Sequence, residues 1–161
     1  SHMDALICTL GEVGAPVEVK EGGLLARGGG EMRAVSIQAL PYPGLATDLQ
    51  APMAALLTQA RGVSYIHERV FDNRLLYVSE LRKMGAEVVI TGTTAIVAGP
   101  SPLVGTTVRV LDVRAGAAVV LAALAARGRT EIADIYHLDR GYECFDVKLR
   151  SLGAAIERVA V

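Results

Sequence analysis

A helix-like segment, a Gly-Ala pair and a strand-like segment occur in that order three times in this chain of 161 residues. The glycines of the three copies are Gly14, Gly85 and Gly153, which lie 71 and 68 residues apart. A second pattern, an apolar helix followed by a glycine and a β-rich run, recurs at Gly62 and Gly128, 66 residues apart. Repeats of this length indicate copies of one folding unit that share a core, so the sequence predicts an α/β fold of related units.

Each unit is expected to contain one buried helix, one shorter helix and about four strands. Residues 115–127 are apolar nearly all round, which predicts a helix buried on most sides. Thr47 stands three residues before Gln50, the spacing of a capping box, and predicts a second buried helix over 49–61. The other predicted helices are 4–13, 77–84 and 142–152, and the predicted strands are 17–20, 24–27, 33–39, 63–68, 87–91, 94–98, 107–111, 130–135 and 156–159. Because the chain begins at a shorter helix, the first unit is expected to be truncated.

Composition limits the class of protein. Hydrophobic residues make up 52% of the chain and aromatic residues 4%, so the core is expected to be aliphatic. A net charge of −1 gives no general attraction to nucleic acid or to an anionic membrane, and no apolar stretch has the length of a membrane span. Cys8 and Cys144 lack the spacing of a metal site, and we expect neither a metal nor a cofactor. Residues 1–3, Ser-His-Met, are typical of a tag remnant, which leaves residues 4–161 as a single expected domain.

The segment Pro41–Gln50, with the sequence PYPGLATDLQ, is the least generic part of the chain. Two prolines and a glycine stiffen a loop, and Asp48 follows at a helix start, where unpaired N–H groups and the helix dipole favour a carboxylate. Taken alone, Asp48 or Thr47 at this position is most simply a helix cap. The functional alternative is a carboxylate that accepts a proton or binds a sugar hydroxyl.

The repeat also relates charged residues to one another. Counted from Gly62 and Gly128, Asp48 corresponds to Arg114, and Arg74 corresponds to Arg140. These positions fall at helix starts and strand ends, where α/β folds present functional groups, so they are predicted to line one rim. Arginine suits a ligand that carries phosphate and carboxylate, because its planar fork donates paired hydrogen bonds and keeps its charge.

Four segments in the same order resemble the carboxy-terminal part of the UDP-N-acetylglucosamine enolpyruvyl transferases (1-carboxyvinyltransferases). They are PYPGLATDLQ at 41–50, Phe-Asp-Asn-Arg at 71–74, Asp-Val-Arg at 112–114 and His-Leu-Asp-Arg-Gly-Tyr-Glu at 137–143. The resemblance covers essentially residues 4–161. It implies an enolpyruvyl-transferase-like domain of repeated units, with buried helices and outer mixed four-stranded sheets. It also implies that the N-terminal catalytic domain, which forms the other wall of the cleft, is missing from this chain.

The resemblance implies an activity as well. Enzymes of this kind move the enolpyruvyl group of phosphoenolpyruvate to the 3-hydroxyl of UDP-N-acetylglucosamine and release phosphate, an early step of peptidoglycan synthesis in the bacterial cytoplasm. The implied roles are Asp48 as the catalytic base, Val70 and Phe71 as contacts to the sugar nucleotide, Arg74, Arg114 and Arg140 as groups for phosphoenolpyruvate or domain closure, and Asp112 as a group that orients a neighbour.

Three interpretations of the chain remain open at this point. As half of a cleft, it is expected to be inactive alone, to bind the sugar nucleotide weakly and to self-associate through its unpartnered sheet edge. The related 3-phosphoshikimate 1-carboxyvinyltransferase has the same fold, although the segments around Asp48 and Arg140 fit the sugar enzyme better. A non-catalytic binding or regulatory module of this fold is the alternative from a different class.

Overall fold

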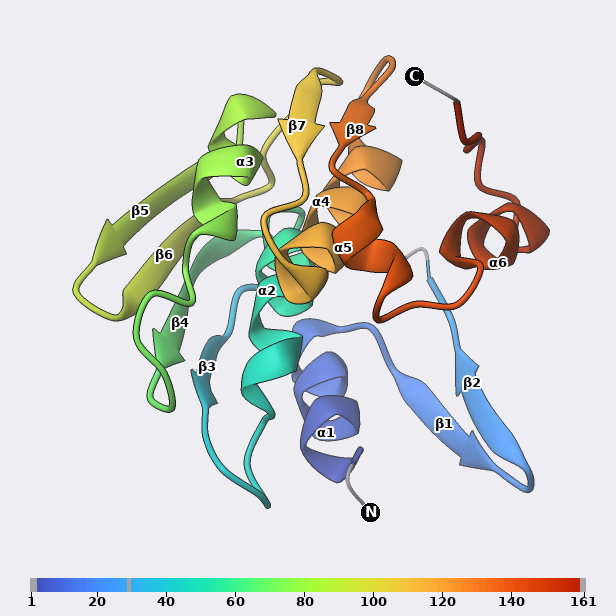
Figure 1. The fold of residues 1–161 in the computed structure, drawn as a ribbon. Helices are drawn as coiled ribbons and strands as arrows, with labels where there is room; N and C mark the ends of the chain where they lie inside the picture. Colours follow the sequence, from blue (N-terminus) through green and yellow to red (C-terminus); the bar gives the residue numbers. More distant parts are fainter. Residues whose placement is uncertain (1–2, 29, 160–161) are drawn as a thin grey trace.

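The computed structural model describes residues 3–28 and 30–159 (Figure 1). Ser1 and His2 of the predicted tag remnant, and the last two residues of the predicted domain, lie outside the described residues. The elements are, in chain order, α1 (Asp4–Val13), β1 (Val17–Lys20), β2 (Gly23–Ala26), β3 (Ser36–Ala39), α2 (Thr47–Leu57), β4 (Gly62–Glu68), α3 (Tyr77–Lys83), β5 (Glu87–Thr91), β6 (Thr94–Gly99), β7 (Thr107–Arg109), α4 (Val113–Ala125), β8 (Glu131–Ala133), α5 (Tyr136–Asp139) and α6 (Phe145–Ser151).

The central unit runs from β3 to β6 and forms a mixed four-stranded sheet in the order β3-β4-β6-β5. β3 and β4 are parallel and are joined by α2, whereas β6 pairs antiparallel with both β4 and β5. β7 and β8 repeat the first half of this unit, as a parallel pair joined by α4. The β1–β2 hairpin after α1 repeats the second half. The α/β fold of related units is therefore confirmed, and the β1–β2 and β7–β8 sheets are two-stranded in the described chain.

The repeated Gly-Ala pairs end three helices in the same way. Gly14, Gly85 and Gly153 have φ values of 96°, 94° and 96°, a left-handed conformation that a side chain would strain. After each glycine, the alanine N–H donates to a leucine carbonyl five residues back: Ala15 to Leu10, Ala86 to Leu81 and Ala154 to Leu149. This pattern is a Schellman C-cap, which ends the helix and turns the chain outward.

Two helices form the centre of the core. α2 packs against α4, and α3 packs against α4 and β5 (Figure 1). In α4, every residue from Ala115 to Val120 is buried, as the all-round apolar pattern predicts. The small side chains of α4 let its neighbours approach closely: a Cβ on Gly116 would come within 2.8 Å of Val110 and Leu138 side-chain atoms. The core is aliphatic, and Tyr77 is the one aromatic side chain among the buried residues of the described chain.

Several predicted boundaries are wrong. α2 begins at Thr47 and ends at Leu57, α6 begins at Phe145, and the short helix α5 occupies part of the last motif. The strand predicted at 156–159 is absent from the described residues, because no neighbouring strand lies there to accept its backbone hydrogen bonds.

Candidate functional site

The first turns of α2 and α4 bring opposite charges together. Asp48 is the second residue of α2 and Arg114 is the second residue of α4, as the 66-residue offset predicts. Asp48 Oδ1 accepts hydrogen bonds from Arg74 Nη1 at 3.4 Å and from Arg114 Nη1 at 3.5 Å. The Asp48 side chain is 69% exposed, whereas that of Arg74 is 17% exposed. Both arginine side chains are thus packed against the protein, and the Asp48 carboxylate between them faces solvent. Its hydrogen bonds to the two arginines are long and weak, so a ligand can replace them.

Asp112 fixes Arg114 from the other side. As N-cap of α4, its Oδ1 accepts the backbone N–H groups of Arg114 (2.8 Å) and Ala115 (2.9 Å), and its Oδ2 accepts Arg114 Nη2 at 3.0 Å. Burial acts to raise the pKa of Asp112, but the hydrogen bonds from Arg114 and Ala115 outweigh it, so this pKa lies below its ordinary value. Asp112 thus holds the Arg114 guanidinium, which also contacts Asp48, while its role in a reaction stays a prediction.

The capping box predicted at the start of α2 is not formed. The N-cap residue is Ala46, and no side chain caps this helix end. Thr47 Oγ1 instead donates to Glu68 Oε2 at 2.6 Å, and Gln50 Nε2 donates to the same oxygen at 3.3 Å. Both side chains point inward because Glu68, on β4, is buried beside them. The spacing of Thr47 and Gln50 therefore reflects a tertiary contact and not a local cap.

The loop after β4 contains Val70 and Phe71, the residues predicted to contact the sugar nucleotide. The backbone N–H groups of Val70 and Phe71 donate to Glu68 Oε1 at 2.7 and 3.2 Å, which holds the loop against the strand end. The Phe71 ring is half exposed, and the Arg74 guanidinium lies over it at 4.3 Å from the centroid. This cation–π contact leaves Phe71 and Arg74 together at the surface, beside Asp48.

A buried amide links this loop to α2. Gln50 Nε2 donates to the Arg74 carbonyl at 3.2 Å, and its Oε1 accepts the Tyr77 hydroxyl at 2.8 Å. Burial, and then the charge of Glu68, raise the pKa of Tyr77 well above its usual range, so Tyr77 stays a hydrogen-bond donor. The result is one connected network beneath the exposed charges.

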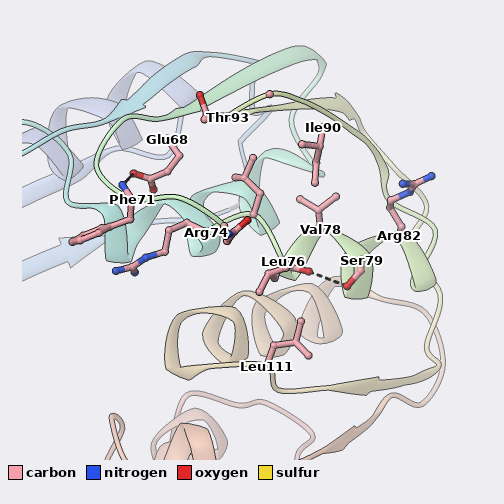
Figure 2. Close-up of a pocket in the computed structure, with 13 residues that line it drawn as sticks. Glu68, Phe71, Arg74, Leu76, Val78, Ser79, Arg82, Ile90, Thr93 and Leu111 are labelled. Carbon is pink, nitrogen blue, oxygen red and sulfur yellow. Dashed lines mark hydrogen bonds between the residues drawn. The ribbon is translucent and has the colours of Figure 1, made fainter.

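A pocket of about 330 Å³ opens next to this loop (Figure 2). Figure 2 shows Phe71 and Arg74 at one end of the pocket and Arg82 at the other, with the apolar side chains of Leu76, Val78, Ile90 and Leu111 between them. Its volume is at the lower limit of small-molecule sites, and it shares Glu68, Phe71 and Arg74 with the charged cluster. A small crevice lined by Thr47, Gln50, Arg74, Asp112 and Arg114, among others, lies between the two helix starts.

Arg140 is not brought into the Asp48 cluster. It is exposed at the C-cap of α5, and it makes none of the side-chain hydrogen bonds or ion pairs found among the described residues. Its neighbour Asp139 pairs with Arg158 at 2.8 Å. Burial, and then the charge of Asp48, raise the pKa of Tyr142, two residues further on. The role predicted for Arg140 stays a prediction, because the described chain does not bring this side chain to Asp48.

Sequence reasoning missed one residue of this site, Glu68, which joins α2 to the loop after β4. Glu68 had a detectable signal, since it takes an inward position of β4 in register with the buried Ser64 and Ile66. A charged residue at such a position needs buried partners.

Among residues 3–28 and 30–159, no group of three or more His, Cys, Asp or Glu side chains is arranged to hold a metal ion. None of the described helices has the length and apolar character needed to cross a membrane.

The chain is similar in sequence to a known protein family and to named bacterial enzymes. The family model of EPSP synthase (3-phosphoshikimate 1-carboxyvinyltransferase) matches residues 1–149. UDP-N-acetylglucosamine 1-carboxyvinyltransferase 1 of Caldanaerobacter subterraneus subsp. tengcongensis is 50% identical over 98% of this chain, and UDP-N-acetylglucosamine 1-carboxyvinyltransferase 2 of Carboxydothermus hydrogenoformans is 48% identical over 99%. The chain spans only about 38% of the length of these two relatives.

Solved structures agree on the fold. The enolpyruvyl transferase NikO from Streptomyces tendae superposes on 99% of this chain with a TM-score of 0.91 and 33% sequence identity, and the match covers 37% of NikO. An EPSP synthase from Acinetobacter baumannii matches 80% of this chain with a TM-score of 0.58 at 18% identity, a likeness of fold alone. The family match over most of the chain, together with this superposition, shows that the chain belongs to the EPSP synthase (3-phosphoshikimate 1-carboxyvinyltransferase) family of enolpyruvyl transferases.

Proposed function

We propose that this chain forms one wall of the active site of a UDP-N-acetylglucosamine enolpyruvyl transferase, with residues 4–161 as its carboxy-terminal domain. The observation that carries the proposal is Asp48, an exposed carboxylate held between Arg74 and Arg114 at two adjacent helix starts. The names of the most similar sequences support the sugar nucleotide as the substrate.

The reaction needs a base next to a hydroxyl group. In the proposed reaction, the 3-oxygen of the sugar bonds to C2 of phosphoenolpyruvate while C3 gains a proton. C3 then loses a proton, the bond between C2 and the phosphate oxygen breaks, and phosphate leaves. Asp48 accepts the proton of the 3-hydroxyl, because it is the exposed carboxylate of the cluster and its contacts to arginine are long enough to be exchanged.

The arginines suit the second substrate. Phosphoenolpyruvate carries a carboxylate and a phosphate, and guanidinium groups bind both through paired hydrogen bonds. Arg114 is oriented by Asp112, and Arg74 by the Phe71 ring, so both side chains are preorganised. Arg140 is exposed and available for the phosphate once the opposing wall closes. Val70 and Phe71 face the sugar nucleotide from the loop after β4.

The proposal also predicts how the isolated chain behaves. Its partners are UDP-N-acetylglucosamine, phosphoenolpyruvate and an N-terminal catalytic domain that closes over the site, in the bacterial cytoplasm. Because one wall buries too little of each substrate, the isolated chain is expected to release no phosphate above a control without protein. Its exposed β1–β2 hairpin, which carries Val19, Leu24 and Leu25 at the surface, is the proposed edge for self-association.

Titration of UDP-N-acetylglucosamine followed by amide chemical shifts tests the site. Saturable shifts centred on Asp48, Phe71 and Arg74, with a roughly millimolar Kd, are expected for the wild-type chain. They should be lost in Asp48→Asn and kept in Glu131→Gln, which removes one exposed charge from β8. Shifts elsewhere, or shifts that persist in Asp48→Asn, would contradict the proposal.

The same titration separates the alternative functions. The name of the matching family model keeps 3-phosphoshikimate as a second candidate substrate. Amide shifts at Asp48 with 3-phosphoshikimate, and none with the sugar nucleotide, would favour a 3-phosphoshikimate 1-carboxyvinyltransferase. A non-catalytic module would show neither pattern at Asp48.

A further inference from the structure

Four hydrogen bonds converge on Glu68, and they come from two separate segments. From α2, Thr47 Oγ1 (2.6 Å) and Gln50 Nε2 (3.3 Å) donate to Oε2. From the loop after β4, the N–H groups of Val70 (2.7 Å) and Phe71 (3.2 Å) donate to Oε1. Because each carboxylate oxygen serves one segment, this side chain ties the start of α2 to the loop.

Both segments carry groups of the proposed active site. Asp48 follows Thr47 in the first turn of α2, and Phe71 holds the Arg74 guanidinium against its ring. Gln50 strengthens the link, since the amide that donates to Glu68 also donates to the Arg74 carbonyl. The position of Asp48 relative to Arg74 therefore depends on contacts that meet at Glu68.

Packing alone does not account for a carboxylate at this place. Glu68 is only 3% exposed, at an inward position of β4 between core residues. Burying such a group costs free energy unless its oxygens are fully hydrogen-bonded, and an apolar side chain of similar size would serve the core equally well. What an apolar side chain cannot do is accept hydrogen bonds from α2 and from the loop at once.

We infer that Glu68 is a positioning residue of the active site, which fixes Asp48 relative to Phe71 and Arg74 without touching substrate itself. Figure 2 shows Glu68 next to Phe71, whose backbone N–H donates one of these hydrogen bonds. The inference rests on the proposed function for its ligand. Its structural part, the coupling of the two segments, does not depend on that ligand.

Glu68→Gln is the test variant, and Glu80→Gln is its matched control. Glu80 is also 3% exposed and also accepts a backbone N–H, that of Arg109 at 2.9 Å, together with the Lys83 ammonium at 2.8 Å. It joins α3 to β7, and its hydrogen-bond partners Ser79, Lys83 and Arg109 are not residues of the Asp48 cluster. Each change replaces one acceptor oxygen of a buried glutamate with an amide donor, so both variants should lose stability.

Two readouts separate positioning from simple loss of stability. Without ligand, amide order parameters at 47–49 and 69–74 should fall together in Glu68→Gln and stay at wild-type values in Glu80→Gln. With UDP-N-acetylglucosamine, the initial slope of the amide shifts against ligand should fall about tenfold in Glu68→Gln, the factor that corresponds to about 1.4 kcal/mol, and should be unchanged in Glu80→Gln.

The outcomes distinguish this inference from the proposed function. In one outcome the wild-type chain binds the sugar nucleotide, and Glu68→Gln changes neither the amide order parameters nor the binding. That outcome would overturn the positioning role and leave the proposed function standing. Coupled loss of order in Glu68→Gln, with no binding by the wild-type chain, would support the positioning role and count against the proposed ligand. The positioning role would also be overturned if Glu68→Gln and Glu80→Gln lowered the amide order parameters at 47–49 and 69–74 equally.

Discussion

Replacing Asp112 by alanine removes two separate contributions that its carboxylate makes. As N-cap of α4 it accepts two backbone N–H groups, and it also pairs with Arg114 at 3.0 Å. Loss of such a cap costs about 1 kcal/mol in the free energy of unfolding, within a range of about 0.5–2. The Asp112 and Arg114 side chains are 38% and 30% exposed, so their pair is screened and contributes only about 0.2–1 kcal/mol.

The two contributions can be measured separately. Asp112→Ala should lower Tm by about 3–8 °C, since 1 kcal/mol corresponds to about 2–4 °C in a domain of this size. Asp112→Asn keeps an oxygen that caps the helix about as well and loses only the charge, so its Tm should fall by about 1–3 °C. Circular dichroism of both variants and of the wild-type chain, in the same buffer at pH 7, gives the comparison.

The pH dependence gives the sign of the charge contribution. The pKa of Asp112 lies below its ordinary value in the folded chain. The charge therefore stabilises the fold above the unfolded pKa of about 3.9, and this stabilisation is lost as the pH falls through the lower folded pKa. The Tm difference between wild type and Asp112→Asn should shrink towards pH 3. Equal losses in the alanine and asparagine variants, or none in the alanine variant, would refute the capping role.

Two further predictions concern the interior. Tyr77→Phe leaves Gln50 Oε1 without its buried donor and should cost about 1–2 kcal/mol in urea unfolding, and a loss below about 0.5 kcal/mol would show that the Gln50 network relaxes freely. Gly99→Ala should cost about 2–3 kcal/mol, because its Cβ would press on the backbone carbonyl of Ala60, whereas Gly11→Ala in α1 meets no atom within 4 Å and should stabilise by about 0.5–1 kcal/mol. The reverse order of the two glycine variants would contradict the close approach at β6.

Part of this fold could be predicted because its signals are local. The Gly-Ala pairs require a left-handed residue, and α1 ends at Val13 as expected, with Gly14 in that conformation. The charged cluster was predictable in part because the repeat places Asp48 and Arg114 at equivalent helix starts. Equivalent positions in repeated units indicate which residues lie close together in the fold, which a single motif does not.

The rest depended on contacts distant in sequence. Thr47 and Gln50 have capping-box spacing, yet their side chains bond to Glu68, which lies 21 and 18 residues away. Arg140 corresponds by symmetry to Arg74, but the third unit folds differently there, since α5 precedes it and its last predicted strand is absent from the described residues. Local propensity does not contain this packing. The inward position of Glu68 indicates that it needs buried partners, but the local sequence does not identify Thr47 and Gln50 as those partners, nor the different fold around Arg140.

Phosphate release by a hybrid enzyme would show whether Asp48 acts as the catalytic base. In the hybrid, residues 4–161 replace the matching segment of the Caldanaerobacter relative, which is 50% identical to this chain, and the substrates are UDP-N-acetylglucosamine and phosphoenolpyruvate. We expect turnover by the hybrid, a loss in kcat of at least about 10²-fold in Asp48→Asn, and an unchanged rate in Glu131→Gln. If the Asp48→Asn variant of the hybrid releases phosphate as fast as the unmodified hybrid, Asp48 does not take the proton of the sugar hydroxyl as proposed.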